Sequence, residues 1–213
     1  MYDTLLFDLD GTIVDSSRGI TNCAIYALEK FGITVTDRRE LYRFIGPPLV
    51  DSFRDFYGFS DESAKAAVAF YRERYREVGM YENDIYEGIP ELLESLRARG
   101  KRIFLATSKP EEFAKKILEY LKLDKYFDLI AGATFDRSRD TKESVIRYAL
   151  AEGGLVPDET VVMIGDRLHD VEGAQAVGLD SIGVLWGFGS REELESAGAT
   201  CIAATPEELF SIV

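Results

Sequence analysis

The length and composition of the chain exclude several broad classes of protein before any motif is considered. The sequence has 213 residues, of which 46% are hydrophobic and 30% charged. A chain of this size and composition buries enough apolar surface for a core without disulfide or metal staples. Its two cysteines, Cys23 and Cys201, lie far apart in sequence and belong to no metal-binding motif, so we expect a reducing, cytoplasmic location.

The charge balance argues against nucleic acid as a partner. With 25 basic and 38 acidic residues the net charge is −13, whereas polyanion binding rests on clustered lysine and arginine. No basic leader and no apolar run of about 20 residues is visible, so we expect no membrane partner. An anionic substrate would need positive charge supplied locally, by a bound cation or a lysine in the site.

Strands and helices alternate through most of the sequence. Short apolar runs without alternation predict strands buried on both faces, at residues 4–9, 102–107, 128–132, 160–165 and 181–185. Segments with helical periodicity lie between most of them, at residues 90–99, 110–121, 142–152 and 170–177. A last strand at residues 200–203 and a helix from Pro206 close the sheet edge. The repeating βα unit predicts an α/β fold with a doubly wound parallel sheet.

One connection is much longer than a crossover needs, because about ninety residues separate the first and second predicted strands. Within residues 15–84 of this connection we predict four helices and no strand, at residues 17–31, 37–45, 49–57 and 61–78, with Ser60 as an N-cap. The aromatic stripe of the last helix predicts packing inside this helical module. The chain therefore divides into a core of residues 1–13 and 85–213 and an all-helical insertion of residues 14–84.

Acidic and hydroxyl side chains lie at the ends of three of the predicted strands. The acids are Asp8 and Asp10 at the end of the first strand and Asp166 at the end of the fourth, and the hydroxyls are Thr107 and Ser108 at the end of the second. Because open parallel sheets bind ligands outside the carboxyl ends of their strands, we expect these side chains at one rim. Crowded acids repel one another, and a hard cation offsets that repulsion. Oxygen ligands alone favour Mg²⁺.

Asp8 and Asp10 are the candidates for the chemistry itself. They lie two residues apart, and Gly11 permits a sharp turn, so one carboxylate can point at a reacting centre while the other transfers a proton. The alternative is a plain surface turn, because Asp-Gly is a common turn signal. The apolar run before the pair and Thr12 after it favour a nucleophile with an acid/base partner.

The other candidate site residues each have a structural interpretation as well as a functional one. Thr107 and Ser108, before a helix that starts near a proline, suit a phosphoryl oxygen but are also typical of helix capping. Lys142, at a predicted helix start, is either a solvated surface lysine or the cation that an acidic site needs for an anion. Asp166 fits metal ligation, or capping of the helix that begins near Asp170.

The segment after the fifth predicted strand also has two possible interpretations. Trp186 and Phe188 either line the rim of the site or pack a loop that precedes a capping box formed by Ser190 and Glu193. His169, the only histidine in the sequence, has acids around it and no His or Cys partner. We therefore expect His169 at the surface, without a ligand or base role.

Four motifs, in order along the chain, resemble those of the haloacid dehalogenase superfamily of phosphohydrolases. They are Asp8-x-Asp10-Gly11-Thr12, Thr107, Lys142 and Gly165-Asp166-x-x-x-Asp170. The helical insertion resembles the cap of the subgroup that includes phosphoglycolate phosphatases, and residues 44–49 resemble its substrate-facing loop. The similarity covers essentially the whole chain. Residues 107–110 and 183–189 look closest to members described as phosphoglycolate phosphatase-like or 5′-nucleotidase-like.

The resemblance implies a Rossmann-like catalytic core, an inserted cap and a Mg²⁺-dependent phosphatase that acts through an aspartyl-phosphate. Asp8 would be the nucleophile and Asp10 the general acid and base. True dehalogenases lack an acid at the position of Asp10, so hydrolysis of a phosphate ester is favoured over cleavage of a carbon–halogen bond. The predicted metal residues are Asp8, Asp10 through its backbone carbonyl, Asp166 and Asp170, the last orienting a metal-bound water or Lys142.

Substrate contacts are predicted on both parts of the chain. Thr107, Ser108 and Lys142 would take phosphoryl oxygens, and the loop at Gly46 would face the substrate from the cap. Specificity would then be a property of the cap, where Arg43 and Arg54 are further candidates, although an arginine there is also typical of a plain surface.

The sequence identifies neither the substrate nor the final acceptor of the phosphoryl group. The partner is expected to be a small phosphorylated metabolite, such as 2-phosphoglycolate, a nucleoside 5′-monophosphate or a sugar phosphate, and the protein a monomer or homodimer. A phosphomutase of the same superfamily would keep both aspartates and the cap. From a different class, a signalling module that accepts phosphate on an aspartate would share the sheet and the acids, but it needs neither a cap nor Asp10.

Overall fold

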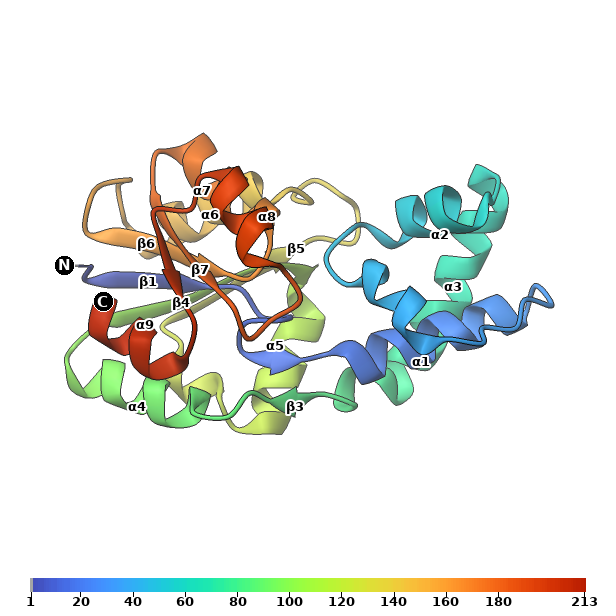
Figure 1. Ribbon diagram of the computed structural model, residues 1–213, viewed down its shortest axis with the longest axis horizontal. Coiled ribbons are helices and arrows are strands. Elements are labelled where there is room, and N and C mark those ends of the chain that lie inside the picture. Colours follow the sequence, from blue (N-terminus) through green and yellow to red (C-terminus); the bar gives the residue numbers. More distant parts are fainter. Residues whose placement is uncertain (1) are drawn as a thin grey trace. The chain divides into compact units, whose positions relative to one another are not determined.

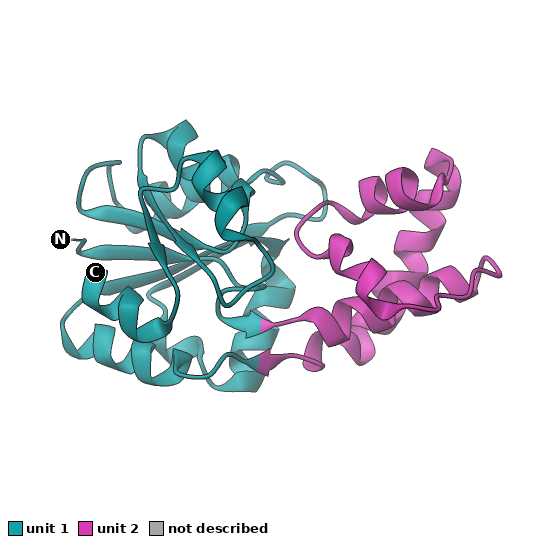
Figure 2. Ribbon diagram, viewed as in Figure 1, with its two compact units in different colours: residues 1–14, 85–213 teal, residues 15–84 magenta. Residues whose placement is uncertain are grey.

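The chain forms two compact units, residues 1–14 with 85–213 and residues 15–84 (Figure 2). The computed structural model describes residues 2–213. The first unit contains a six-stranded parallel sheet in the order β5-β4-β1-β6-β7-β8 (Figure 1). Its strands are β1 Thr4–Phe7, β4 Arg102–Pro110, β5 Leu129–Ala133, β6 Val161–Gly165, β7 Asp180–Val184 and β8 Cys201–Ala203.

Helices cover both faces of this sheet, which confirms the predicted doubly wound α/β fold. Helices α6 and α7 pack on one face, where Leu6, Phe104 and Met163 of the sheet meet Val145 and Ile146 of α6 in one buried cluster. Helices α4, α5 and α9 lie on the other face (Figure 1). The helices are α4 Ile89–Ala98, α5 Glu111–Leu121, α6 Lys142–Gly153, α7 Leu168–Val177, α8 Arg191–Ala197 and α9 Pro206–Ile212, with a short 3₁₀ helix, η3, at Asp124–Tyr126.

Apolar periodicity explains why the sheet forms where it does. All four residues of β1 are buried, as expected for a central strand covered on both faces. Strand β4 is longer than predicted and continues to Pro110, beyond the apolar run that marks it in the sequence. Among residues 2–213, no helix combines the length and the apolar character that crossing a membrane requires.

The second unit is a small helical bundle. It contains α1 Ser17–Glu29, α2 Leu49–Tyr57, α3 Asp61–Glu77 and two 3₁₀ helices, η1 Arg38–Phe44 and η2 Gly79–Tyr81. Ser60 caps α3 as predicted, its side chain accepting a hydrogen bond from the backbone N–H of Ser63. The segment predicted as a helix at residues 37–45 forms a 3₁₀ helix, a geometry that short capped segments commonly adopt.

The aromatic residues of this unit pack against one another. The ring of Phe44 lies 5.0 Å from that of Phe53, and Tyr71 stacks on Tyr75 at 5.5 Å. The predicted apolar stripe of α3 is buried as far as Tyr75, but Val78, which follows the helix, is 45% exposed. The stripe is therefore core packing, and Val78 is not part of it.

Two very short strands mark the places where the chain enters and leaves the helical unit. Strand β2 (Val14–Asp15) pairs with β3 (Asp84–Ile85), and the backbone N–H of Tyr86 donates to the carbonyl of Ile13 at 3.2 Å. The sequence predicted no strand in this part of the chain. Two-residue strands carry no periodicity, so no pattern could reveal them.

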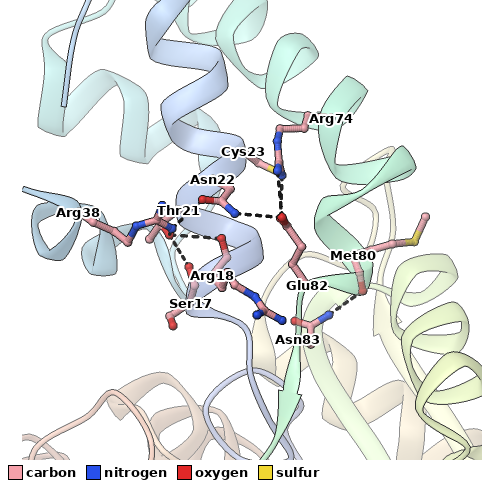
Figure 3. Close-up of polar contacts among 10 residues, drawn as sticks. All are labelled: Ser17, Arg18, Thr21, Asn22, Cys23, Arg38, Arg74, Met80, Glu82 and Asn83. Atoms are coloured by element: carbon pink, nitrogen blue, oxygen red, sulfur yellow. Dashed lines mark hydrogen bonds and ion pairs between the residues drawn. The ribbon is translucent and has the colours of Figure 1, made fainter.

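A polar network fixes the segment that returns from the helical unit (Figure 3). Glu82 accepts two hydrogen bonds from Arg74 of α3, at 2.8 and 3.0 Å, and one from Asn22 of α1 at 3.0 Å. Both side chains of the ion pair are less than a quarter exposed. The hydrogen bond from Arg74, with that from Asn22, lowers the pKa of Glu82 below its usual range despite the opposing effect of burial. Glu82 thus ties this segment to two helices.

Replacing Glu82 by Gln is expected to lower the free energy of unfolding at pH 7 by about 1–2 kcal/mol, because a charged, two-pronged hydrogen bond is lost. A carboxylate with a lowered folded pKa stabilises the protein above its unfolded pKa, and this contribution is lost as the pH falls through the folded pKa. Urea titrations should therefore show the difference between wild type and variant shrinking from pH 6 towards pH 3. Exposed Glu77→Gln is the matched control, and a difference that stayed constant with pH would contradict the assignment.

Candidate active site

The carboxyl ends of three neighbouring strands carry the predicted site residues of the first unit. Strand β1 lies between β4 and β6 in the sheet, and all three run parallel. Asp8 follows β1, Thr107 and Ser108 lie in the last part of β4, and Asp166 follows β6. The strand order therefore places these residues along one edge of the sheet, where open α/β folds bind ligands.

The turn after β1 is built around Gly11. Its φ angle of +84° lies in the left-handed region, and a Cβ atom there would come within 2.2 Å of Oδ2 of Asp166. The backbone N–H of Gly11 donates to the carbonyl of Val14 at 2.8 Å, which closes the turn. A glycine is thus required both by the backbone and by the close approach of a neighbouring carboxylate.

Three carboxylates gather at this edge. Asp8, Asp166 and Asp170 each offer an oxygen within 4.8 Å of the others. Asp166 is fully buried and accepts a hydrogen bond from the backbone N–H of Phe188 at 2.7 Å. Burial, together with the charges of Asp170 and Asp8, raises the pKa of Asp166 well above its ordinary value. Burial also raises the pKa of Asp170, although Lys142 opposes this.

Lys142 is the cation of this cluster. It is the first residue of α6, after the N-cap Thr141, and its Nζ atom lies 2.8 Å from Oδ1 of Asp8 and 2.7 Å from Oδ1 of Asp170. The same ammonium donates to the carbonyl of Ala106 at 3.0 Å. Burial disfavours the ammonium, but the charges of Asp170 and Asp8 outweigh that effect and raise the pKa of Lys142. The interpretation of Lys142 as a solvated surface lysine is wrong.

Asp10 lies beside this cluster and not in it. Its Oδ1 atom is 2.5 Å from Nζ of Lys109, and both side chains are mostly buried. Its carboxylate is not one of the three that gather around Asp8. The prediction of Asp10 as a metal residue therefore rests on its backbone carbonyl alone.

The capping alternatives for the hydroxyl and acid candidates are not borne out. Helix α5 begins after Pro110 and has no side-chain cap, so neither Thr107 nor Ser108 caps it. The hydroxyl of Thr107 is buried and accepts a hydrogen bond from the backbone N–H of Lys109, while Ser108 is partly exposed. At the start of α7 it is Asp170, not Asp166, that accepts a hydrogen bond from the backbone N–H of the N-cap residue Arg167, at 3.1 Å.

The loop after β7 supports the acidic residues. Trp186 donates from its indole nitrogen to the carbonyl of Thr12 at 3.0 Å. A Cβ atom at Gly189 would lie 1.8 Å from the backbone oxygen of Asp166, so only glycine allows the loop to pass this close. Trp186 and, through its backbone, Phe188 therefore contact the site residues directly.

The predicted capping box of the following helix is half formed. Ser190 caps α8 by accepting from the backbone N–H of Glu193. The Glu193 carboxylate does not return to Ser190, because it accepts hydrogen bonds from the side chain of Arg167 and the backbone N–H of Leu168. A partly buried arginine needs a carboxylate partner more than an exposed N–H does. The box prediction was wrong for this reason.

Two predicted residues are not members of this cluster. His169 is half exposed, and its Nδ1 atom lies 3.9 Å from Oε2 of Glu172. Gly46 belongs to the unit of residues 15–84, with a φ angle of +105° that favours glycine. Its predicted contact with substrate remains a prediction.

Sequence reasoning missed Lys109, whose ammonium holds the Asp10 carboxylate. Nothing local marks this residue, because its partner is 99 positions away. The one available signal was a lysine directly after a buried strand and beside two hydroxyl residues, in a chain whose net charge called for a local cation.

Comparison with known proteins supports the predicted superfamily over most of the chain. A protein-family model described as haloacid dehalogenase-like hydrolase matches residues 5–184. A solved structure of a predicted phosphatase from Clostridium acetobutylicum has a TM-score of 0.95 and 48% identity, covering 100% of this chain and 98% of that one. The fold and the four ordered motifs therefore agree with the family match.

Three curated relatives carry different names. A 5′-nucleotidase of Pseudomonas aeruginosa is 47% identical over 92% of this chain and 88% of its own length. The tyrosine-protein kinase PtkA of Mycobacterium tuberculosis is 40% identical over 96% of this chain and 70% of its own length. A phosphoglycolate phosphatase of Colwellia psychrerythraea is 27% identical over 98% of this chain and 95% of its own length. Relatives of this chain thus carry the names of different activities.

Proposed function

The chain belongs to the haloacid dehalogenase-like hydrolase family, and we propose that it is a phosphatase that hydrolyses small phosphate monoesters through an aspartyl-phosphate on Asp8. The observation that carries this proposal is the position of the Lys142 ammonium, 2.8 Å from the Asp8 carboxylate inside a buried acidic cluster. A lysine there can neutralise both the nucleophile and an incoming phosphoryl oxygen.

The acidic cluster fits a hard divalent cation. Three carboxylates and one ammonium carry a net charge of −2 when all are ionised, and the buried Oδ1 atoms of Asp8 and Asp170 form no well-oriented hydrogen bond. Oxygen ligands without sulfur or imidazole suit Mg²⁺. Asp8, Asp166 and the backbone carbonyl of Asp10 would hold it, with Asp170 orienting Lys142. When bound, the ion neutralises charge and polarises a phosphoryl oxygen.

The side chains of the first unit can then perform both halves of the reaction. In the first half an Asp8 oxygen attacks phosphorus, the P–O bond to the alcohol breaks, and the proton of Asp10 moves to the departing oxygen. In the second half Asp10 takes a proton from water while the water oxygen attacks phosphorus, and the bond from Asp8 to phosphorus breaks. Thr107 and Lys142 would hold the remaining phosphoryl oxygens, with Ser108 beside them.

The unit of residues 15–84 is proposed to be the cap that selects the substrate and excludes water while the acyl-phosphate exists. Gly46 and Arg43 are the candidates for substrate contact in it. The guanidinium of Arg43 lies 4.4 Å from the ring centre of Phe56, a cation–π contact that helps to hold the charge in place.

Nucleoside 5′-monophosphates are the first substrate class to test, because the relative named 5′-nucleotidase has 47% identity and the relative named phosphoglycolate phosphatase 27%. We would measure phosphate release at neutral pH from 5′-monophosphates, 2-phosphoglycolate and sugar phosphates, in Mg²⁺ and in EDTA. Mg²⁺-dependent release is expected, and the largest kcat/KM identifies the substrate class. Release that is unchanged in EDTA would contradict the metal assignment.

The relative named a tyrosine-protein kinase gives a reason to test a second acceptor. If the aspartyl-phosphate passed to a sugar or protein hydroxyl and not to water, labelled phosphate would appear on that acceptor without free phosphate. A long-lived phosphorylated protein without turnover would instead indicate a signalling module. Either result would contradict the phosphatase.

A further inference from the structure

A second buried lysine serves the other proposed catalytic aspartate. The Nζ atom of Lys109 lies 2.5 Å from Oδ1 of Asp10, and the two side chains are 6% and 16% exposed. Lys142 forms ion pairs with Asp8 and Asp170. The two aspartates of the first motif are thus each paired with their own ammonium.

The backbone of β4 fixes the place from which Lys109 reaches Asp10. The pairing of β4 with β5 shifts register between Thr107 and Pro110, and irregularities of this kind at a strand end re-aim a side chain. The backbone N–H of Lys109 donates to the hydroxyl of Thr107 at 3.2 Å. A Cβ atom at Gly132 of the neighbouring strand would lie 2.7 Å from the carbonyl of Lys109. The main chain is therefore held on both sides.

The contact involves one oxygen of the carboxylate. The ammonium of Lys109 donates to Oδ1 of Asp10. A carboxyl group held by one oxygen has a defined plane, and its other oxygen can exchange a proton with a reacting atom. Burying an ammonium is costly unless it is paired, so a methionine of similar length would fill this space more cheaply if packing were the only requirement.

We propose that Lys109 is a positioning residue for proton transfer by Asp10, an inference that rests on the proposed phosphatase function. Lys109 anchors Oδ1, and Oδ2 carries the proton. That proton passes to the leaving-group oxygen as the phosphorus–oxygen bond breaks. Oδ2 then takes a proton from the attacking water, which restores the carboxyl group for the next cycle. Lys109 gives up no proton in either half.

This role makes the effect of losing Lys109 depend on the leaving group. An alkoxide is a strong base and needs a proton as it departs, whereas 4-nitrophenolate is stable as an anion at neutral pH. The value of kcat/KM reports the steps up to departure of the alcohol. A comparison of kcat/KM between substrates therefore measures proton transfer to the leaving group. It does not measure the later attack of water, which is common to all substrates.

The experiment compares Lys109→Met with wild type on glycerol 2-phosphate and 4-nitrophenyl phosphate. We expect kcat/KM to fall about 10–100-fold for the alkyl ester, a part of the 10²–10⁴-fold that general acid catalysis supplies, and to stay within about threefold for the aryl ester. Because attack of water is also slowed, the variant should release a burst of nitrophenolate equal to the enzyme concentration. Lys109→Arg should recover part of the alkyl activity, and exposed Lys116→Met on α5 should match wild type.

Two results would overturn the proposal. The first is an equal loss of kcat/KM for both esters in Lys109→Met, together with no recovery in Lys109→Arg. The second is a loss of kcat/KM for 2-phosphoglycolate, whose leaving group is anionic, with no loss for glycerol 2-phosphate. Lys109 would then bind the substrate and not Asp10.

A double variant tests the route through Asp10 independently of any general damage. Adding Lys109→Met to Asp10→Asn is expected to leave kcat/KM for the alkyl ester unchanged, because the group through which Lys109 acts is already absent. A further loss in the double variant would overturn the proposal. Wild-type turnover that disappears in Asp8→Asn tests the phosphatase itself, so a failure of the function and a failure of the Lys109 role give different results.

Discussion

Replacing Asp8 by Asn is expected to lower phosphate release by on the order of 10⁴-fold or more, for every substrate that the wild type hydrolyses. An amide oxygen is a poor nucleophile, so the acyl-phosphate does not form. The variant is nearly isosteric, and it removes one negative charge from a cluster whose net charge is −2. Its melting temperature in EDTA should therefore equal or exceed that of the wild type.

The matched control is Asp3→Asn, an exposed acid just before the same strand. This control should keep full activity. Rates are measured as phosphate release in Mg²⁺, with melting followed by circular dichroism on the same samples. An Asp8→Asn protein that hydrolyses substrate at near the wild-type rate would remove Asp8 from the nucleophile role, and a variant that had lost its fold would show it in the melting curve.

The fold could be predicted because its strands are buried on both faces. A strand such as β6, Val161–Gly165, is buried at all five positions, so its sequence is a continuous apolar run that no surface element imitates. Helix boundaries agreed to within one or two residues in most cases, and α2 agreed at both ends. The two-residue strands β2 and β3 could not be found, since they exist only through pairing between segments about seventy residues apart.

Site residues could be predicted where the order of the strands alone brings them together. Asp8 and Asp166 follow neighbouring parallel strands, so a topological rule is enough to bring them to one edge. Lys142 was harder, because nothing in its own segment separates a surface lysine at a helix start from a buried one. Its burial depends on Asp8 and Asp170, which lie 134 and 28 positions away by residue number.

The capping-box prediction failed because two groups can bind the same carboxylate. Glu193 has the spacing of a capping box with Ser190, but the guanidinium of Arg167 claims its carboxylate. The Asp10 carboxylate pairs with the ammonium of Lys109, 99 positions away, a contact that its spacing from Asp8 does not reveal. Local spacing shows what a residue can reach along its own segment, and the charges that tertiary contacts bring near it decide which of those contacts forms.

Replacing Lys142 by Met is expected to give the second large effect, on stability as well as on rate. The change leaves the buried carboxylates of Asp8, Asp166 and Asp170 without their ammonium. Removing one partner of a buried ion pair costs roughly 3–5 kcal/mol, because an uncompensated charge remains. Phosphate release should fall at least about 10²–10³-fold, the usual effect of losing one charged group that stabilises the reacting oxygens.

The dependence on pH and on Mg²⁺ distinguishes this mechanism from lost packing. A carboxyl group whose folded pKa is raised, as for Asp166 and Asp170, stabilises the protein fully below its unfolded pKa, and this contribution is lost as the pH rises through the folded pKa. The deficit of Lys142→Met in EDTA should therefore be larger at pH 7 than at pH 4. Saturating Mg²⁺ at pH 7 should restore part of the stability, because the cation replaces the missing positive charge.

Lys101→Met is the matched control for this experiment. Lys101 is buried to the same extent as Lys142 and donates to the carbonyl of Tyr2, near the start of β4 and away from the acids. Its loss should cost about 1–3 kcal/mol, with neither a dependence on Mg²⁺ nor an effect on phosphate release. Urea unfolding of both variants, in Mg²⁺ and in EDTA at the two pH values, makes the comparison. If Lys142→Met lost the same stability in all four conditions, the cluster would not be held by charge, and the reason for placing a cation there would disappear.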